Sequence, residues 1–150
     1  MCWHFFIREA NLNDHPPESA IKILIVDDDI ISRMMLMHLI SACGYCDIVE
    51  AEDGLDAWQQ LERGLRPAIL FCDARMPRLS GMELLQRVKG DVELAAMLFV
   101  LVSSAHEEAS VQQALAAGAS GYLVKPFRAE GVRTSLRALL ERASAGSLQR

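Results

Sequence analysis

Residues 68–81 read Ala-Ile-Leu-Phe-Cys-Asp-Ala-Arg-Met-Pro-Arg-Leu-Ser-Gly and are the most informative part of this chain. Their first part, residues 68–72, is a short continuous apolar run bounded by turn residues, which is typical of a buried parallel strand. Asp73 follows this run and opens a loop. Because open α/β sheets bind ligands at the carboxyl ends of their strands, the pattern predicts a ligand site at Asp73.

The same arrangement occurs at two other apolar runs. Residues 21–26 lead into Asp27 and Asp28, and residues 120–124 lead into Lys125. If these runs are neighbouring strands of one sheet, three carboxylates and one ammonium group meet in a small pocket. Two further strands therefore point to the same site.

Strand and helix patterns alternate along the rest of the chain, which predicts a parallel sheet with helices on both faces. Right-handed crossovers restrict the possible topologies, and the flavodoxin-like strand order 2-1-3-4-5 would make the first and third strands neighbours. The expected strands are 21–26, 47–51, 68–72, 97–102 and 120–124, and the expected helices are 30–42, 54–64, 81–89, 107–117 and 128–142. We expect residues 1–20 to be an extension or linker, 21–142 to form one folded domain, and 143–150 to be a flexible tail.

Composition excludes several classes of protein. The chain has 150 residues, 51% hydrophobic and 23% charged, as in a globular protein of one domain, and its net charge of −5 argues against a nucleic-acid footprint. No apolar stretch reaches the roughly 18 residues of a membrane helix. The apolar residues 1–7 lack a basic region before them and a cleavage site after them, so the expected location is the cytoplasm.

The acidic pocket favours phosphoryl transfer. Crowded carboxylates repel one another, so either one of them binds a proton or a cation neutralises them. Oxygen-rich sites with few protein ligands suit Mg²⁺, and a carboxylate can attack phosphorus to give an aspartyl-phosphate. Such a transfer depends mainly on positioning and charge neutralisation, and Lys125 offers a positive charge opposite the cation.

Four motifs in this order resemble the receiver domain of bacterial two-component response regulators, over about residues 21–140. They are Asp27-Asp28-Asp29 after the first strand, Asp73-Ala74-Arg75-Met76-Pro77 with Ser80-Gly81, Ser104-Ala105, and Lys125-Pro126-Phe127. Asp29 itself we interpret as the cap of the first helix.

The resemblance implies how the metal and the phosphoryl group are held. Asp73 would be the phosphoacceptor, and Asp28, Asp73 and the backbone carbonyl of Arg75 would bind Mg²⁺ directly. Asp27 would act through water. Two large side chains at the mouth of the pocket, Arg75 and His106, would slow the hydrolysis of the phosphoaspartate.

The resemblance also implies a switch. Ser104 and Lys125 would contact the phosphoryl group, and the Lys125–Pro126 peptide bond would be cis. Tyr122 would change rotamer when Ser104 moves, although a tyrosine on a strand is as readily a core residue. The output surface would be the face made by the fourth helix, the fifth strand and the fifth helix.

The implied partners are a histidine kinase or a histidine phosphotransfer protein and an unidentified output protein, with homodimerisation also open. The donor would dock at the first helix, where Met34, Met35 and Met37 offer an adaptable surface. For each methionine taken singly, a core position is the expectation. The chain would be no turnover enzyme, because a phosphatase of the haloacid dehalogenase type carries an acid where Arg75 stands. A module of a larger regulator and a receiver-like module that is never phosphorylated are the alternatives.

Overall fold

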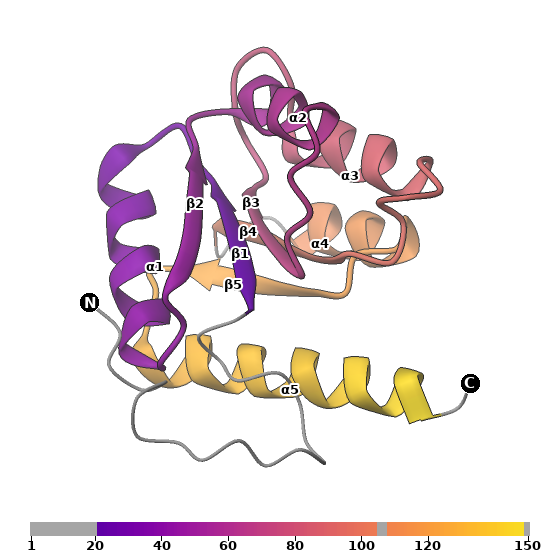
Figure 1. The fold of residues 1–150 in the computed structure, drawn as a ribbon. Helices are drawn as coiled ribbons and strands as arrows, with labels where there is room; N and C mark the ends of the chain where they lie inside the picture. Colours follow the sequence, from indigo (N-terminus) through magenta and orange to yellow (C-terminus); the bar gives the residue numbers. More distant parts are fainter. Residues whose placement is uncertain (1–20, 105–107, 149–150) are drawn as a thin grey trace.

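A computed structural model of the chain describes residues 21–104 and 108–148 (Figure 1). Its centre is a sheet of five parallel strands in the order β2-β1-β3-β4-β5. The strands are β1 (Lys22–Val26), β2 (Asp47–Ala51), β3 (Ile69–Asp73), β4 (Leu98–Ser104) and β5 (Gly121–Lys125). The predicted doubly wound α/β fold and its strand order are confirmed.

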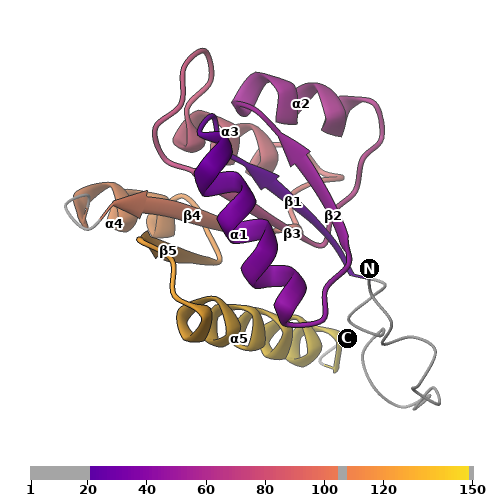
Figure 2. The ribbon, with the colours of Figure 1, turned by 90° about the vertical axis from the view of Figure 1, so that its left-hand side faces the viewer.

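Five helices cover the two faces of this sheet. They are α1 (Ile30–Ala42), α2 (Gly54–Glu62), α3 (Gly81–Lys89), α4 (Glu108–Ala116) and α5 (Ala129–Leu148). Helices α1 and α5 pack on one face, and α2, α3 and α4 pack on the other (Figures 1 and 2). Because both faces are covered, the central strands are apolar on both sides and read as continuous runs.

The core therefore has two layers, and neighbouring residues of one strand belong to different layers. Ile25 and Phe71 pack towards α1 and α5, whereas Leu24, Leu70 and Cys72 pack towards α2, α3 and α4. All five are essentially inaccessible to solvent. This rigid sheet fixes where each strand ends, and the candidate site lies at those ends.

Three strands run further than the apolar pattern predicts. The parallel ladder continues through the pairs Asp73↔Val102 and Ser104↔Lys125, so Asp73, Ser104 and Lys125 are the last residues of β3, β4 and β5. The apolar pattern ends these strands at residues 72, 102 and 124, before each of the three side chains. Backbone hydrogen bonding to a neighbouring strand does not require an apolar side chain, and the apolar run therefore underestimates the strand.

Helix α5 continues to Leu148, six residues beyond the end expected for the last helix at residue 142. Residues 143–148 contain no proline and include alanines, which have the highest helix propensity, so the helix can propagate through them. The extension at 1–20 and His106 lie outside the described residues. No helix in the part of the chain that the structure describes is long and apolar enough to cross a membrane.

Candidate functional site

Three carboxylates meet at the carboxyl edge of the sheet. Asp27 and Asp28 directly follow β1, and Asp73 ends the neighbouring strand β3. Val26 pairs with Cys72, so the ends of the two strands lie side by side. One oxygen from each carboxylate lies within 4.8 Å of the others. A compact set of oxygen donors of this kind fits a hard divalent cation such as Mg²⁺.

The predicted ammonium group also reaches this cluster. The Nζ atom of Lys125 lies 3.1 Å from Oδ2 of Asp27 and 3.4 Å from Oδ1 of Asp73. Lys125 ends β5, which is separated from β3 by β4, so its side chain extends back across the end of β4. The Lys125–Pro126 peptide bond is cis, as the resemblance implied.

Asp27 is held in place from several directions. Its side chain is 5% exposed, and its Oδ1 accepts a hydrogen bond of 2.9 Å from the backbone N–H of Asp29. Its backbone carbonyl accepts a bond of 2.6 Å from Arg33, whose guanidinium also pairs with Glu50 at 2.9 Å. Asp28, by contrast, is exposed. The cluster therefore combines one fixed, buried carboxylate with one that water can reach.

Asp29 acts as the helix cap that the sequence predicts. Its side chain accepts a hydrogen bond from the backbone N–H of Ile31 and another, of 2.8 Å, from the hydroxyl of Ser32. These bonds lower the pKa of the Asp29 carboxyl, chiefly through Ser32. The third acid of the Asp27-Asp28-Asp29 motif thus begins α1 and stands outside the carboxylate cluster.

The electrostatics of the pocket are unbalanced in the absence of a cation. Burial raises the pKa of Asp73 to about 6, and the charges of Asp27 and Asp28 add to this, while Lys125 opposes it. Burial alone would lower the pKa of Lys125, but its hydrogen bonds and charge interactions with Asp27 and Asp73 outweigh burial and raise it. The lysine therefore stays charged, and the carboxylates retain excess negative charge.

The loop after Asp73 turns back sharply onto the strand. A Cβ atom at Gly81 would lie 2.4 Å from the backbone oxygen of Asp73, so only glycine fits where α3 begins. The Gly81 N–H donates to the oxygen of Ala74 at 3.2 Å, and the Ala74 N–H donates to that of Val102 at 2.8 Å. Arg75 follows and is exposed.

The two serines at the end of β4 have different environments. Ser104 is exposed and pairs in register with Lys125, at the end of the strand between β3 and β5. Ser103 is 1% exposed, and its hydroxyl has no hydrogen-bond partner among the described residues. Strand alternation places the two side chains on opposite faces of the sheet, and Ser104 is the one that solvent and ligands can reach.

Tyr122 is not a core residue, because it is 49% exposed. It lines a groove of about 240 Å³ together with Leu115 of α4 and with Leu139 and Arg142 of α5. The core interpretation of this tyrosine is therefore wrong, and its role as a switch stays a prediction. Tyr122 belongs to β5, which is an edge strand of the sheet.

Sequence reasoning missed two arginines that support the site. Arg33 connects α1, the Asp27 backbone and Glu50 of β2, and Arg78 forms an ion pair with the buried Asp53. The side-chain partners of the two arginines, Glu50 and Asp53, are 17 and 25 positions away in the sequence. No local spacing signals such contacts.

Comparison with known proteins agrees with this geometry. The family described as the response regulator receiver domain matches residues 23–137. The chain belongs to the response regulator receiver family. This receiver is 32% identical over 120 residues to the chemotaxis protein CheY1 of Helicobacter pylori, covering 80% of the chain and 97% of that protein.

Other relatives place the receiver in the same group. A chemotaxis protein CheY homolog of Campylobacter jejuni is 32% identical over 120 residues, covering 80% of this chain and 92% of that protein. The solved structure of the chemotaxis protein CheY4 of Vibrio cholerae has a TM-score of 0.72 to the receiver at 29% identity, covering 80% of this chain and 98% of that one. The receiver is thus CheY-like in sequence and in fold.

Proposed function

We propose that this receiver is a phosphoacceptor that takes a phosphoryl group from a phosphohistidine onto Asp73 in a reaction that requires Mg²⁺. The observation that carries this proposal is the cluster of Asp27, Asp28 and Asp73, with oxygens within 4.8 Å of one another. Lys125 lies 3.1 and 3.4 Å from two of these acids.

The three acids of the cluster are suited to different contacts with Mg²⁺, direct or through water. Asp27 already accepts hydrogen bonds from the Asp29 N–H and from Lys125, so its oxygens suit water-mediated contact. Asp28 is exposed, and Asp73 is partly so, which leaves them available as direct ligands together with the backbone carbonyl of Arg75. Bound Mg²⁺ supplies positive charge against the phosphoryl oxygens.

The chain's own residues carry the transfer step. A carboxylate oxygen of Asp73 attacks phosphorus, the bond from phosphorus to the histidine nitrogen breaks, and the electron pair returns to the imidazole, which takes a proton from solvent. The pKa of Asp73, about 6, leaves it mainly ionised at neutral pH, as a nucleophile must be. Lys125 holds a positive charge beside the oxygens that become more negative.

The surface of α1 supports the docking of a helical donor. Met34 is 54% exposed and Met35 is 47% exposed, so the core position expected for each of them is wrong, and Met37 is partly buried. Ile30 and Ile31 are also exposed on the same helix, directly after the acidic motif. A histidine kinase or a histidine phosphotransfer protein would cover this apolar surface and bring its phosphohistidine to Asp73.

Phosphorylation would be read out at the face made by α4, β5 and α5. The phosphoryl group would contact Ser104 and Lys125, which end β4 and β5, and the added charge would favour one of two states of this face. The groove beside Tyr122 lies on this face and would receive the output protein. The same face would alternatively form the interface of a homodimer.

The receiver would be no turnover enzyme. Its phosphoaspartate would hydrolyse slowly, and Arg75 and His106 would set the lifetime by shielding phosphorus from water. Such a protein would work in the cytoplasm, alone or as one module of a larger regulator.

Mass measurement tests the proposal. The purified protein is incubated with acetyl phosphate and Mg²⁺, and we expect its intact mass to rise by one phosphoryl group. Asp73→Asn and addition of a chelator should each abolish the rise, and Asp47→Asn, at the far end of β2, should not. An unmodified wild-type protein would favour the alternative of a receiver that is never phosphorylated.

A further inference from the structure

The loop between β3 and α3 is fastened to the start of α2 by an ion pair. The guanidinium of Arg78 donates to the carboxylate of Asp53, whose side chain is 3% exposed. Asp53 also caps α2, because its Oδ1 accepts a bond of 2.8 Å from the backbone N–H of Asp56. The buried carboxylate of Asp53 therefore caps α2 and also binds the loop that follows Asp73.

The backbone of Arg78 makes this ion pair more informative. Its φ angle is +70°, in the left-handed region that glycine and asparagine adopt at lower cost than arginine. For arginine this backbone conformation costs conformational free energy. The favourable contribution at this position comes from the side chain and its partner Asp53.

Two close backbone contacts surround the ion pair. A Cβ atom at Gly54 would lie 2.3 Å from the backbone oxygen of Leu79, so the first residue of α2 touches the loop directly. The side chain of Leu79 is buried in the core. At the other end of the loop, Gly81 donates to Ala74. The loop is thus anchored on both sides of Arg75.

We infer that the Arg78–Asp53 pair is a positioning device for the metal site, holding the β3–α3 loop so that the carbonyl of Arg75 faces the carboxylate cluster. The inference rests on the proposed function, in which that carbonyl binds Mg²⁺. Arg78 is a positioning residue, because its described contact is with Asp53 and not with the cluster. Partners that orient metal ligands affect affinity strongly although they do not touch the ion.

The direction of the change in Mg²⁺ affinity distinguishes this positioning role from a purely electrostatic effect of the Arg78 charge. Arg78→Gly removes a positive charge near a cation site, which by charge alone should strengthen Mg²⁺ binding. It also suits the left-handed backbone and frees the loop, which should weaken binding. We expect calorimetric titration of the unphosphorylated protein with Mg²⁺ to give an affinity roughly tenfold weaker than that of the wild type.

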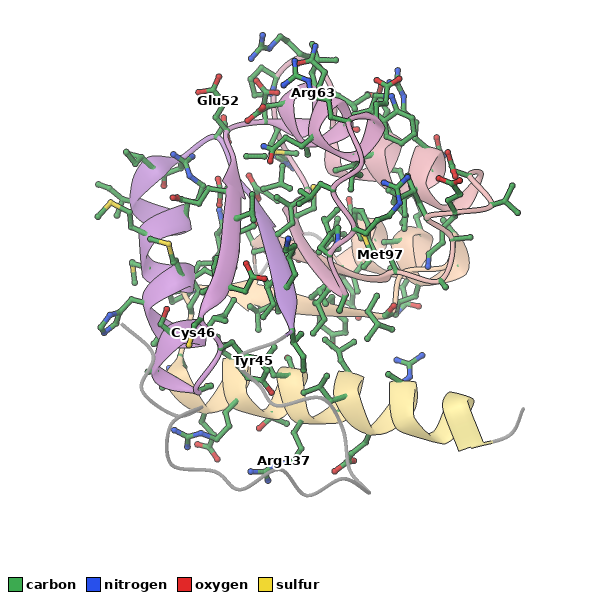
Figure 3. All side chains as sticks on the ribbon, viewed as in Figure 1. Tyr45, Cys46, Glu52, Arg63, Met97 and Arg137 are labelled. Carbon is green, nitrogen blue, oxygen red and sulfur yellow. The ribbon has the colours of Figure 1, made fainter. Side chains whose placement is uncertain are left out.

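Three further variants complete the experiment. Asp53→Asn keeps the helix cap, since asparagine also caps helices, but removes the charge and should weaken Mg²⁺ binding to a similar extent. Arg78→Lys can still pair with Asp53 and should recover part of the affinity. Arg63→Ala removes an exposed arginine at the end of α2 (Figure 3) and should leave the affinity unchanged.

Amide hydrogen exchange gives a readout that does not depend on the metal. The N–H groups of the loop, residues 74–80 except Pro77, should exchange faster in Arg78→Gly than in the wild type, and those of the central strands should not change. Thermal unfolding checks that each variant is folded.

The outcomes are distinct. Unchanged or tighter Mg²⁺ binding in Arg78→Gly, or unchanged exchange in the loop, overturns the positioning role and leaves the proposed function standing. A wild-type protein that binds no Mg²⁺ overturns both. Weaker binding in Arg78→Gly and Asp53→Asn, with recovery in Arg78→Lys, supports the positioning role.

Discussion

The Nζ atom of Lys125 lies 3.1 Å from Oδ2 of Asp27, although the two residues are 98 positions apart in the sequence. The contact joins the end of β5 to the end of β1, across two intervening strands. It brings a positive charge to a buried carboxylate that would otherwise lack a cationic partner in the described structure. Lys125 therefore offsets one of the three negative charges of the pocket.

Replacing this lysine should slow phosphorylation. In Lys125→Met the aliphatic stem stays and the charge is lost, so the phosphoryl oxygens lose a cationic partner. We expect the rate of modification by acetyl phosphate to fall at least tenfold, as is typical when one electrostatic contact to a transition state is removed. Lys22→Met, at an exposed ion pair with Asp47, is the matched control and should react at the wild-type rate.

The same substitution should raise the pKa of Asp73. Lys125 lowers this pKa against the effects of burial and of Asp27, so its removal leaves only the raising influences. We expect the midpoint of the pH dependence of phosphorylation to lie at a higher pH in the variant than in the wild type. An unmoved midpoint would show that another group controls the profile.

Stability without Mg²⁺ should fall as pH rises through the range of about 4 to 6. The folded pKa of Asp73 is raised from 3.8 to about 6, so between these values the folded state binds more protons than the unfolded state. Ionising Asp73 then costs the folded state roughly 1–3 kcal/mol. Urea unfolding should show this loss in the wild type.

Asp73→Asn provides the control for this pH dependence. It removes the ionisation, so the loss between pH 4 and 6 should be largely absent. At pH 7.5 without metal we expect the variant to be more stable than the wild type, by about 1–2 kcal/mol, because the buried repulsion with Asp27 is relieved. A less stable variant would contradict the proposed repulsion.

Mg²⁺ should stabilise the wild type and not a variant with a damaged cluster. A ligand that binds only the folded state raises its stability by about 2.7 kcal/mol at a hundredfold excess over the dissociation constant. We expect a higher melting temperature at millimolar Mg²⁺ in the wild type and in Asp47→Asn, but little shift in Asp28→Asn. Equal shifts in all three proteins would place the bound ion elsewhere.

Gly81→Ala should damage the site through packing alone. Its Cβ atom would lie 2.4 Å from the backbone oxygen of Asp73, so the end of β3 or the start of α3 must move. We expect a loss of about 1–3 kcal/mol in the free energy of unfolding and slower phosphorylation.

Gly131→Ala is the matched control, because nothing lies within 4 Å of a Cβ atom there and the residue is in α5. It should stabilise the protein by about 0.5–1 kcal/mol. Equal phosphorylation rates in the two variants would show that the turn at Gly81 does not position Asp73.

The sequence predicts the strands and the central cluster because both depend on strong local patterns, whereas the strand order comes with the resemblance to the receiver family. Apolar runs mark the strands, and a charged residue at the end of a run identifies an end of the sheet without knowledge of the packing. Asp27, Asp28, Asp73 and Lys125 could all be found in this way. Their convergence then follows from the topology alone.

The remaining features depend on contacts that periodicity does not encode. Arg78 and Asp53 are distant in sequence, and a left-handed arginine has no sequence signature. The exposure of Met34 and Met35 follows from which face of α1 meets the sheet, and the nearly uniform apolar pattern of that helix leaves this undecided. For Tyr122, exposure depends on how closely α4 and α5 approach β5.

The composition of the pocket has a consequence for which ions it would retain. Three carboxylates and one ammonium group leave a formal surplus of two negative charges once all are ionised. A doubly charged ion cancels this surplus, whereas sodium or potassium leaves half of it and a lanthanide exceeds it. Valence matching would then work alongside ionic radius in selecting the occupant, and monovalent salts should compete only weakly for the position.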